Sequence, residues 1–243
     1  MLFAKYTNGG NAMQIFAISD LHYSGIPPVK PMEIFNPMWK NHRDKVRSSW
    51  LDQVSSEDIV LIGGDTSWAL KMEDAQVDLD ELADLPGKKI LIRGNHDYWW
   101  QTQAKMKKIY DNRLIFLQAG ALLLPDGTGI GGTRGWKIPG DPHFFEEDIP
   151  ILARELLRIE MALKELQALP AKRRILFLHF TKKKKNEFPT DISRLLARYP
   201  IELCLYGHLH GETINEIAPT RTPEGLPCKL LSCDATDFKI VNI

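Results

Sequence analysis

Polar side chains that can bind metal ions end apolar runs at five places in the sequence. An aspartate and a histidine two residues apart end IFAISDLH, and two histidines with the same spacing end ELCLYGHLH. Residues i and i+2 of an extended chain point to the same side. The runs IVLIGGD, ILIRGNHD and ILFLH also end in such groups. The side chains delivered in this way are Asp20, His22, Asp65, Asn95, His179, His208 and His210.

Oxygen and imidazole groups in this number favour a site for divalent cations. Without a cation, the clustered carboxylates and imidazoles would be desolvated and poorly paired, which is costly. A set without thiolate suits manganese, iron, zinc or cobalt. Zinc takes only three or four side chains, so we expect two ions that share a bridging carboxylate. One such residue alone is more often a cap or a hydrogen-bonded core group, and the agreement of five strand ends carries the prediction.

Alternating apolar and amphipathic stretches predict an α/β fold, in which the carboxyl ends of strands form one ligand-binding rim. A helix is predicted to begin at Asn36-Pro37 and to continue to Val54, and another to cover EEDIPILARELLRIEMALKELQAL. The glycine-rich stretch 119–140 is interpreted as turns that link short strands. Strands are expected at 14–18, 59–62, 89–92, 114–117, 121–124, 174–178 and 201–205, and within INEI, CKLLSC and FKIVNI.

The bulk composition narrows the class of protein. Basic and acidic residues number 31 each, so no global charge attracts nucleic acid or an anionic membrane. No stretch approaches the ~18 apolar residues of a membrane helix. Three cysteines without framework spacing indicate free thiols in a reducing cytoplasm. We expect residues 1–12 to be an upstream extension or a non-native remnant, and residues 13–243 to form one domain.

Five blocks resemble, in order, those of the calcineurin-like metallophosphoesterases, over most of the chain from about Met13 to Gly211. The resemblance implies a four-layer α/β/β/α sandwich of two mixed sheets flanked by helices. The matching blocks are Asp20-Leu21-His22, Gly64-Asp65, Gly94-Asn95-His96-Asp97, His179 and Gly207-His208-Leu209-His210.

The same resemblance implies a dinuclear metal-dependent phosphoesterase and assigns a role to each matching residue. A metal-bridging hydroxide would attack phosphorus in line, His96 would protonate the leaving group, and Asp97 would orient nearby groups. Manganese is the expected ion, with iron, zinc or cobalt as alternatives. One metal would take Asp20, His22, Asp65 and His210, and the other would take Asp65, Asn95, His179 and His208.

Departures from the family pattern narrow the activity. Protein phosphatases carry a second aspartate where this chain has Trp68, so the partner that orients His96 is left open. Lipid A pathway hydrolases usually carry arginine at the position of His96. We expect a small-molecule or nucleotide phosphodiester as substrate. The alternatives are a phosphomonoesterase, a nuclease, which zero net charge disfavours, and a non-catalytic metal-binding scaffold. The sequence leaves the native substrate and the oligomeric state open.

Two cationic positions are candidate substrate contacts. Lys182 begins a run of four lysines just after His179, and a solvated loop is the alternative interpretation. Arg134 lies in GGTRGW, where a guanidinium could bind phosphate through two hydrogen bonds. A plain hairpin is the alternative there. Trp99 and Trp100 are expected in the core.

Overall fold

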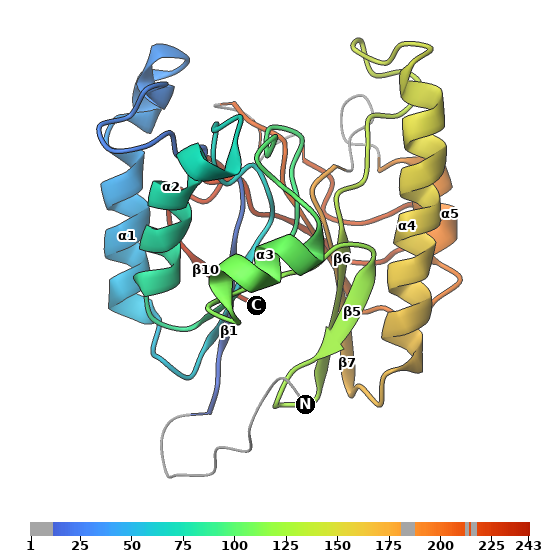
Figure 1. Cartoon of the computed structure of the whole chain (residues 1–243). Coiled ribbons are helices and arrows are strands. Elements are labelled where there is room, and N and C mark those ends of the chain that lie inside the picture. Colours follow the sequence, from blue (N-terminus) through green and yellow to red (C-terminus); the bar gives the residue numbers. More distant parts are fainter. Residues whose placement is uncertain (1–11, 181–187, 212–213, 215–217) are drawn as a thin grey trace.

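Two five-stranded sheets form the centre of the computed structural model, which describes residues 12–180, 188–211, 214 and 218–243 (Figure 1). The strands are β1 (Ile15–Ile18), β2 (Ile59–Ile62), β3 (Lys88–Leu91), β4 (Leu114–Phe116), β5 (Gly120–Leu123), β6 (Thr128–Thr133), β7 (Arg173–Leu178), β8 (Leu203–Tyr206), β9 (Cys228–Leu230) and β10 (Val241–Asn242). The first sheet has the order β10-β1-β2-β3-β4 and the second β5-β6-β7-β8-β9. Only the edge strands β10 and β5 pair antiparallel to their neighbours, so both sheets are mixed.

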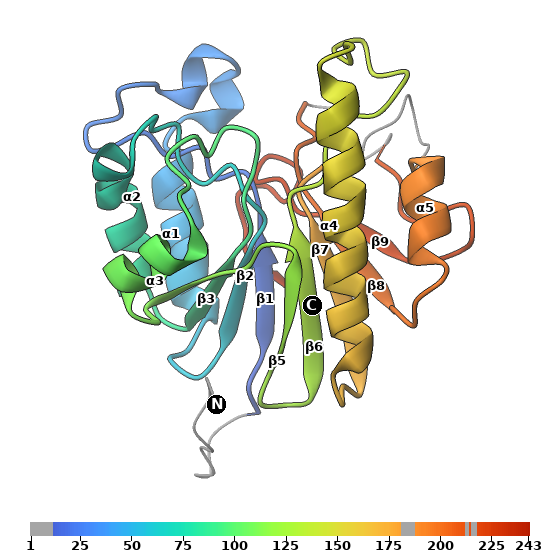
Figure 2. The ribbon, with the colours of Figure 1, turned by 45° about the vertical axis from the view of Figure 1, so that its right-hand side comes forward.

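Helices cover the outer face of each sheet (Figure 2). The first sheet carries α1 (His42–Gln53), α2 (Met72–Asp84) and α3 (Gln103–Tyr110), and the second carries α4 (Asp148–Ala168) and α5 (Thr190–Leu196). Two 3-10 turns, η1 (Met32–Ile34) and η2 (Pro37–Trp39), precede α1. This layer order confirms the predicted sandwich. No helix of the described ranges is long and apolar enough to cross a membrane.

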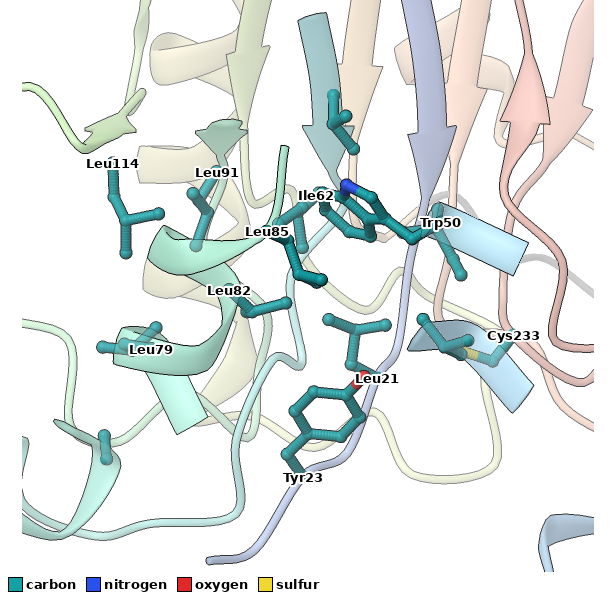
Figure 3. Packing of buried hydrophobic residues seen from close by; sticks show 14 of the residues in the cluster. Leu21, Tyr23, Trp50, Ile62, Leu79, Leu82, Leu85, Leu91, Leu114 and Cys233 are labelled. Carbon is teal, nitrogen blue, oxygen red and sulfur yellow. The ribbon is translucent and has the colours of Figure 1, made fainter. Parts of the chain in front are cut away.

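Alternate residues of the inner strands face different layers. In β1, Phe16 and Ile18 pack beneath the helices, whereas Ile15 and Ala17 pack between the two sheets. Since both faces of such strands are buried, their sequences are continuous apolar runs. Figure 3 shows part of the cluster on the helix side of the first sheet, to which Trp50 of α1 belongs. The three cysteines are buried free thiols, as predicted.

The interpretation of the glycine-rich stretch 119–140 as turns that link short strands missed β6, which forms a fully buried inner strand of the second sheet there. A Cβ added at Gly129 or Gly131 would lie 2.8 or 3.2 Å from side-chain atoms of Leu166 on α4. The glycines therefore let α4 pack closely on this strand. The strand expected in INEI falls mainly on residues outside the described part of the chain.

The helix expected from Asn36 to Val54 is broken into η2 and α1. Asn36 caps the first turn as predicted, because its Oδ1 accepts from the backbone N of Met38 at 2.9 Å. The chain then turns at Asn41, which has a φ of 56°. The break leaves the Trp39 ring beside the imidazoles of His22 and His210, with centroids 5.9 and 5.6 Å away. Trp99 and Trp100 are buried in the core, as expected.

Candidate metal centre

Four of the predicted ligands adopt a strained backbone just beyond a strand end. The backbone φ angles of four residues lie in the left-handed region, which residues other than glycine rarely adopt. They are 60° for Asp20, 48° for His22, 49° for Asp65 and 69° for His208. Such strain persists only where the surrounding structure enforces it, and it gathers at functional sites. The short turns aim these side chains at the space between the strand ends.

The first group of ligand atoms belongs to Asp20, His22 and His210. The Nε2 atoms of the two histidines lie 3.3 Å apart, and Nε2 of His210 lies 3.3 Å from Oδ1 of Asp20. Oδ2 of the buried Asp20 accepts from the backbone N of His208 at 2.9 Å and from the Ser232 hydroxyl at 3.1 Å. The backbone N of His208 also lies 3.2 Å from Oδ1 of Asp20, so the protein holds the whole carboxylate with Oδ1 beside His210.

The second group consists of Asp65, His179 and His208. Nε2 of His179 lies 3.3 Å from Oδ2 of Asp65 and 2.8 Å from Oδ1 of Asn95. The same Oδ2 of Asp65 lies 3.9 Å from Nε2 of His22, so this carboxylate stands between the two groups. The Nδ1 of His179 is held 2.9 Å from the carbonyl oxygen of Gly63, which fixes the orientation of the ring.

The spacing of these atoms fits divalent cations. An ion with bonds of about 2.0–2.2 Å to nitrogen and oxygen places neighbouring ligand atoms roughly 3–3.5 Å apart. His22–His210, His210–Asp20 and His179–Asp65 all have a ligand separation of 3.3 Å. Buried carboxylates and imidazoles with free lone pairs facing one another are costly unless a cation joins them. Both the geometry and the donor types therefore fit a pair of metal sites.

Hydrogen bonds and charge outweigh burial at two of the histidines. Burial disfavours the charged form of His210, but its hydrogen bonds to Asp20 and Asp234 raise its pKa to about 10. Burial acts in the same direction on His179, where the attraction of Asp65 and Asp20 dominates and raises the pKa to about 9. In the metal-free protein both imidazole rings are therefore doubly protonated and positively charged at pH 7.

Burial prevails at the other two histidines. It lowers the pKa of His22 to about 4 and that of His208 to about 3, although nearby carboxylates oppose the shift. Burial opposes ionisation of Asp20 and Asp65, but the neighbouring imidazoles outweigh it and hold both carboxyl pKa values below the ordinary one. The metal-free centre thus combines ionised carboxylates with two neutral imidazoles, those of His22 and His208, which already have the form that binds metal. The rings of His179 and His210 must first lose a proton.

Asp234 belongs to the site, although the sequence analysis did not single it out. Its Oδ1 lies 2.9 Å from Nδ1 of His210, and its Oδ2 accepts from the backbone N of Gly211 at 3.0 Å. A carboxylate on the far nitrogen fixes the tautomer and orientation of a metal-binding histidine. Asp234 directly follows the predicted strand segment CKLLSC, so the rule of strand ends would have found it, although β9 itself ends at Leu230.

Asp97 is completely buried and faces the loop backbone. It accepts from the backbone N of Gly94 at 2.7 Å, from that of Thr66 at 2.8 Å and from Nε1 of Trp99 at 3.0 Å. Burial raises the pKa of its carboxyl to about 6. These hydrogen bonds join the loop after β2 to the loop after β3, so Asp97 holds Asp65 and its neighbours in place.

His96 lies at the wall of a pocket of about 420 Å³ that adjoins both ligand groups. Its ring centroid is 4.2 Å from that of Trp68, which also stacks on His22 at 4.8 Å with an interplanar angle of 23°. Within the described ranges, no side chain forms a hydrogen bond with the His96 imidazole. Trp68, which stands where the protein phosphatases of the family carry a second aspartate, therefore positions His96 by packing.

A comparison with known protein families agrees with this geometry. The model of the calcineurin-like phosphoesterases matches residues 13–212. The chain belongs to the calcineurin-like phosphoesterase family. Among curated proteins, it is 31% identical over 124 residues to the Gene 66 protein of Mycobacterium phage D29. That match covers 49% of this chain and 60% of the phage protein, so it spans less than two thirds of that relative.

Solved structures share the fold of this family member at low sequence identity. The protein of unknown function AQ665 from Aquifex aeolicus has a TM-score of 0.51 and 20% identity, with 95% of this chain and 96% of that chain covered. The protein TT1561 of Thermus thermophilus has a TM-score of 0.52 and 11% identity, with 96% and 99% covered. The family and the two ligand groups together support a metal-dependent phosphoesterase.

The Arg134 side chain pairs with Glu155 and does not line the pocket that adjoins the ligand groups. The Nη2 of its buried guanidinium lies 3.2 Å from Oε1 of Glu155, and the guanidinium packs 4.2 Å from the Trp136 ring centroid. Its carbonyl oxygen accepts from the backbone N of His179 at 3.0 Å, which supports the strand end. A role of Arg134 in binding substrate stays a prediction. Lys182 and the following lysines lie outside the described residues.

Proposed function

We propose that this protein is a dinuclear metal-dependent phosphoesterase that acts on a small-molecule or nucleotide phosphodiester. The observation that carries the proposal is the position of the Asp65 carboxylate, which faces His22 of one ligand group and His179 of the other at the edge of one pocket. The proposed ligands of one ion are Asp20, His22, Asp65 and His210, and those of the other are Asp65, Asn95, His179 and His208.

Two bound divalent cations, with Mn²⁺ as the expected ion, supply a water of lowered pKa and neutralise phosphoryl charge. The protein contributes the remaining steps. His96 faces the pocket beside both ligand groups, and we assign to its imidazole the transfer of a proton to the departing alkoxide. Trp68 and Asp97 hold that ring and its loop in position.

The size of the pocket supports a small substrate. A volume of about 420 Å³ is in the range of sites for small molecules. The net charge of zero gives no general attraction to nucleic acid. A phosphomonoesterase would use the same ligands and the same acid, so it is the second candidate.

Hydrolysis of model esters tests the proposal. Metal-stripped protein is titrated with Mn²⁺, and its hydrolysis of bis(p-nitrophenyl) phosphate is compared with that of p-nitrophenyl phosphate. We expect metal-dependent cleavage with a preference for the diester. Asp65→Asn keeps the size of the side chain and should lose activity by at least about 100-fold. The exposed Asp52→Asn on α1 is the control.

Three results would revise the proposal. A preference for the monoester would favour the phosphomonoesterase. Stoichiometric metal binding without hydrolysis of either ester would favour the non-catalytic scaffold. Full activity of Asp65→Asn would exclude the assigned metal centre.

A further inference from the structure

One wall of the pocket beside the metal centre is built from residues that bind no metal. It lies on the segment between β1 and α1, together with the indole of Trp68, which packs beside His22 and His96. Asp65 and four histidines line the same pocket, so a ligand in it can touch both sides. The residues of this wall are Lys30, Met32, Phe35, Asn36, Trp39 and Trp68.

Hydrogen bonds hold the base of this segment in one conformation. The Ser24 hydroxyl lies 3.1 Å from both the backbone N and the carbonyl oxygen of Lys30, which closes the loop between them. The buried carboxylate of Asp78 accepts from the backbone N of Gly25 at 3.0 Å and from the Ser67 hydroxyl at 2.6 Å. Asp78 thus ties this loop to the loop that carries Trp68. A wall fixed in this way loses little entropy when a ligand binds.

The ammonium group of Lys30 contacts aromatic rings and no carboxylate. Its Nζ lies 3.1 Å from the ring centroid of Trp68 and 5.4 Å from that of Phe35. In the ranges that the structure describes, Lys30 forms no ion pair with an acidic side chain. A cation held by ring faces keeps its charge available to an anion in the pocket. Lys30 lines the same pocket as His22, His96, His208 and His210.

Phe35 exposes an aromatic ring at the rim of the same pocket. Its side chain is 60% exposed, and it lines the pocket. A large apolar side chain exposed at a pocket is typical of a ligand-binding surface. The face of an aromatic ring gains most from a flat unsaturated partner, because offset stacking adds to the burial of area.

We infer that Lys30 and Phe35 determine specificity by binding the organic part of the substrate. That part is a flat, unsaturated group that lies against Phe35 and carries an anionic substituent that pairs with Lys30. The inference rests on the proposed function to the extent that the phosphoryl group of the same molecule must lie at the metal ligands.

Binding of three non-hydrolysable phosphonates to the Mn²⁺-loaded protein tests the inference. Titration calorimetry gives the Kd of methylphosphonate, phenylphosphonate and 4-carboxyphenylphosphonate. We expect phenylphosphonate to bind about five- to tenfold more tightly than methylphosphonate. The carboxylate should add about threefold. Phe35→Ala should abolish the first difference and Lys30→Met the second.

Neighbouring residues supply the controls. Ile34→Ala and Lys40→Met replace exposed side chains that do not line the pocket, and both should keep the preferences of the unmodified protein. Equal affinities for the three probes, or binding of none of them, would overturn the inference. Tighter binding of decylphosphonate than of phenylphosphonate would also overturn it, because the wall would then suit an alkyl chain.

A parallel assay separates this inference from the proposed function. Normal hydrolysis of bis(p-nitrophenyl) phosphate without discrimination among the phosphonates would reject only the role of Lys30 and Phe35. Discrimination that Phe35→Ala and Lys30→Met abolish, without hydrolysis of any ester, would support the binding wall and reject the esterase.

Discussion

The Nε2 atoms of His22 and His210 lie 3.3 Å apart, although 188 residues separate them in the chain. His22 follows a strand of the first sheet and His210 a strand of the second. The second ligand group is built in the same way, with Asp65 from the first sheet and His179 and His208 from the second. The candidate metal centre therefore joins the two sheets at their carboxyl ends.

Replacement of Asp234 by asparagine should weaken metal binding at the site of His210. Asparagine keeps the size of the side chain but removes the negative charge that faces Nδ1 of His210 at 2.9 Å. Loss of such a support typically costs about 10- to 100-fold in affinity. Competition of Mn²⁺ with a fluorescent chelator measures the change. Asp237→Asn, at an exposed position nearby, is the matched control, and equal affinities of the two variants would contradict the assigned role.

Replacement of Gly207 by alanine should disturb both the fold and the metal centre. The added Cβ would overlap the Ser19 hydroxyl and Oδ2 of Asp20, where the two sheets approach each other. Overpacking of this kind costs about 1–3 kcal/mol of unfolding free energy, and displacement of Asp20 should reduce metal content. Thermal melting and elemental analysis measure the two effects. Gly120→Ala, whose Cβ would meet only the end of the flexible Glu165 side chain, should change neither.

Replacement of His96 by glutamine should slow catalysis and leave the metals in place. Loss of a general acid costs about 10²- to 10⁴-fold in kcat, and the loss is largest for alkyl leaving groups that need a proton. Rates for a series of aryl and alkyl diesters should therefore depend more steeply on leaving-group pKa in His96→Gln than in the unmodified protein. His143→Gln, at an exposed position outside the pocket, is the control. An unchanged slope would argue against His96 as the acid.

Metal binding should release protons at neutral pH. The pKa values of His210 and His179 are raised to about 10 and about 9, so both rings are protonated at pH 7 in the metal-free protein. Each ring must lose its added proton before it can bind an ion. For each proton released, the affinity for Mn²⁺ should therefore rise about tenfold per pH unit, up to about pH 9. Titration with Mn²⁺ in two buffers of different ionisation enthalpy measures the release.

A variant of this protein tests the number of protons that are released on metal binding. Asp234→Asn removes one of the groups that raise the pKa of His210, so at about pH 9, close to the raised pKa values, this variant should release fewer protons than the unmodified protein. Heats that do not depend on the buffer would show that both rings are neutral before the metal binds.

Local features of the sequence were sufficient to predict the strands other than β6 and the polar groups that end the apolar runs. Strands buried on both faces are apolar runs, and a polar residue directly after such a run, as His179 after β7, is visible without any structure. The order of the five blocks then indicated the family, and with it the two-sheet sandwich. The break at Asn41 was missed because the spacing of Trp39, Val46 and Trp50 is compatible with one continuous helix and does not reveal the turn between them.

The strand β6, the packing around Trp68 and the grouping of the metal-binding residues were decided only by the tertiary structure. The strand β6 carries too few side chains to show a pattern, and its glycines are explained by the close approach of α4. The packing of Trp68 on His96 and the wall formed with Lys30 depend on loops that are far apart in the sequence. The chain by itself determined which residue types could bind metal. Only the packing of one sheet against the other decided which of them lie close enough to share an ion, because each group takes its residues from both sheets.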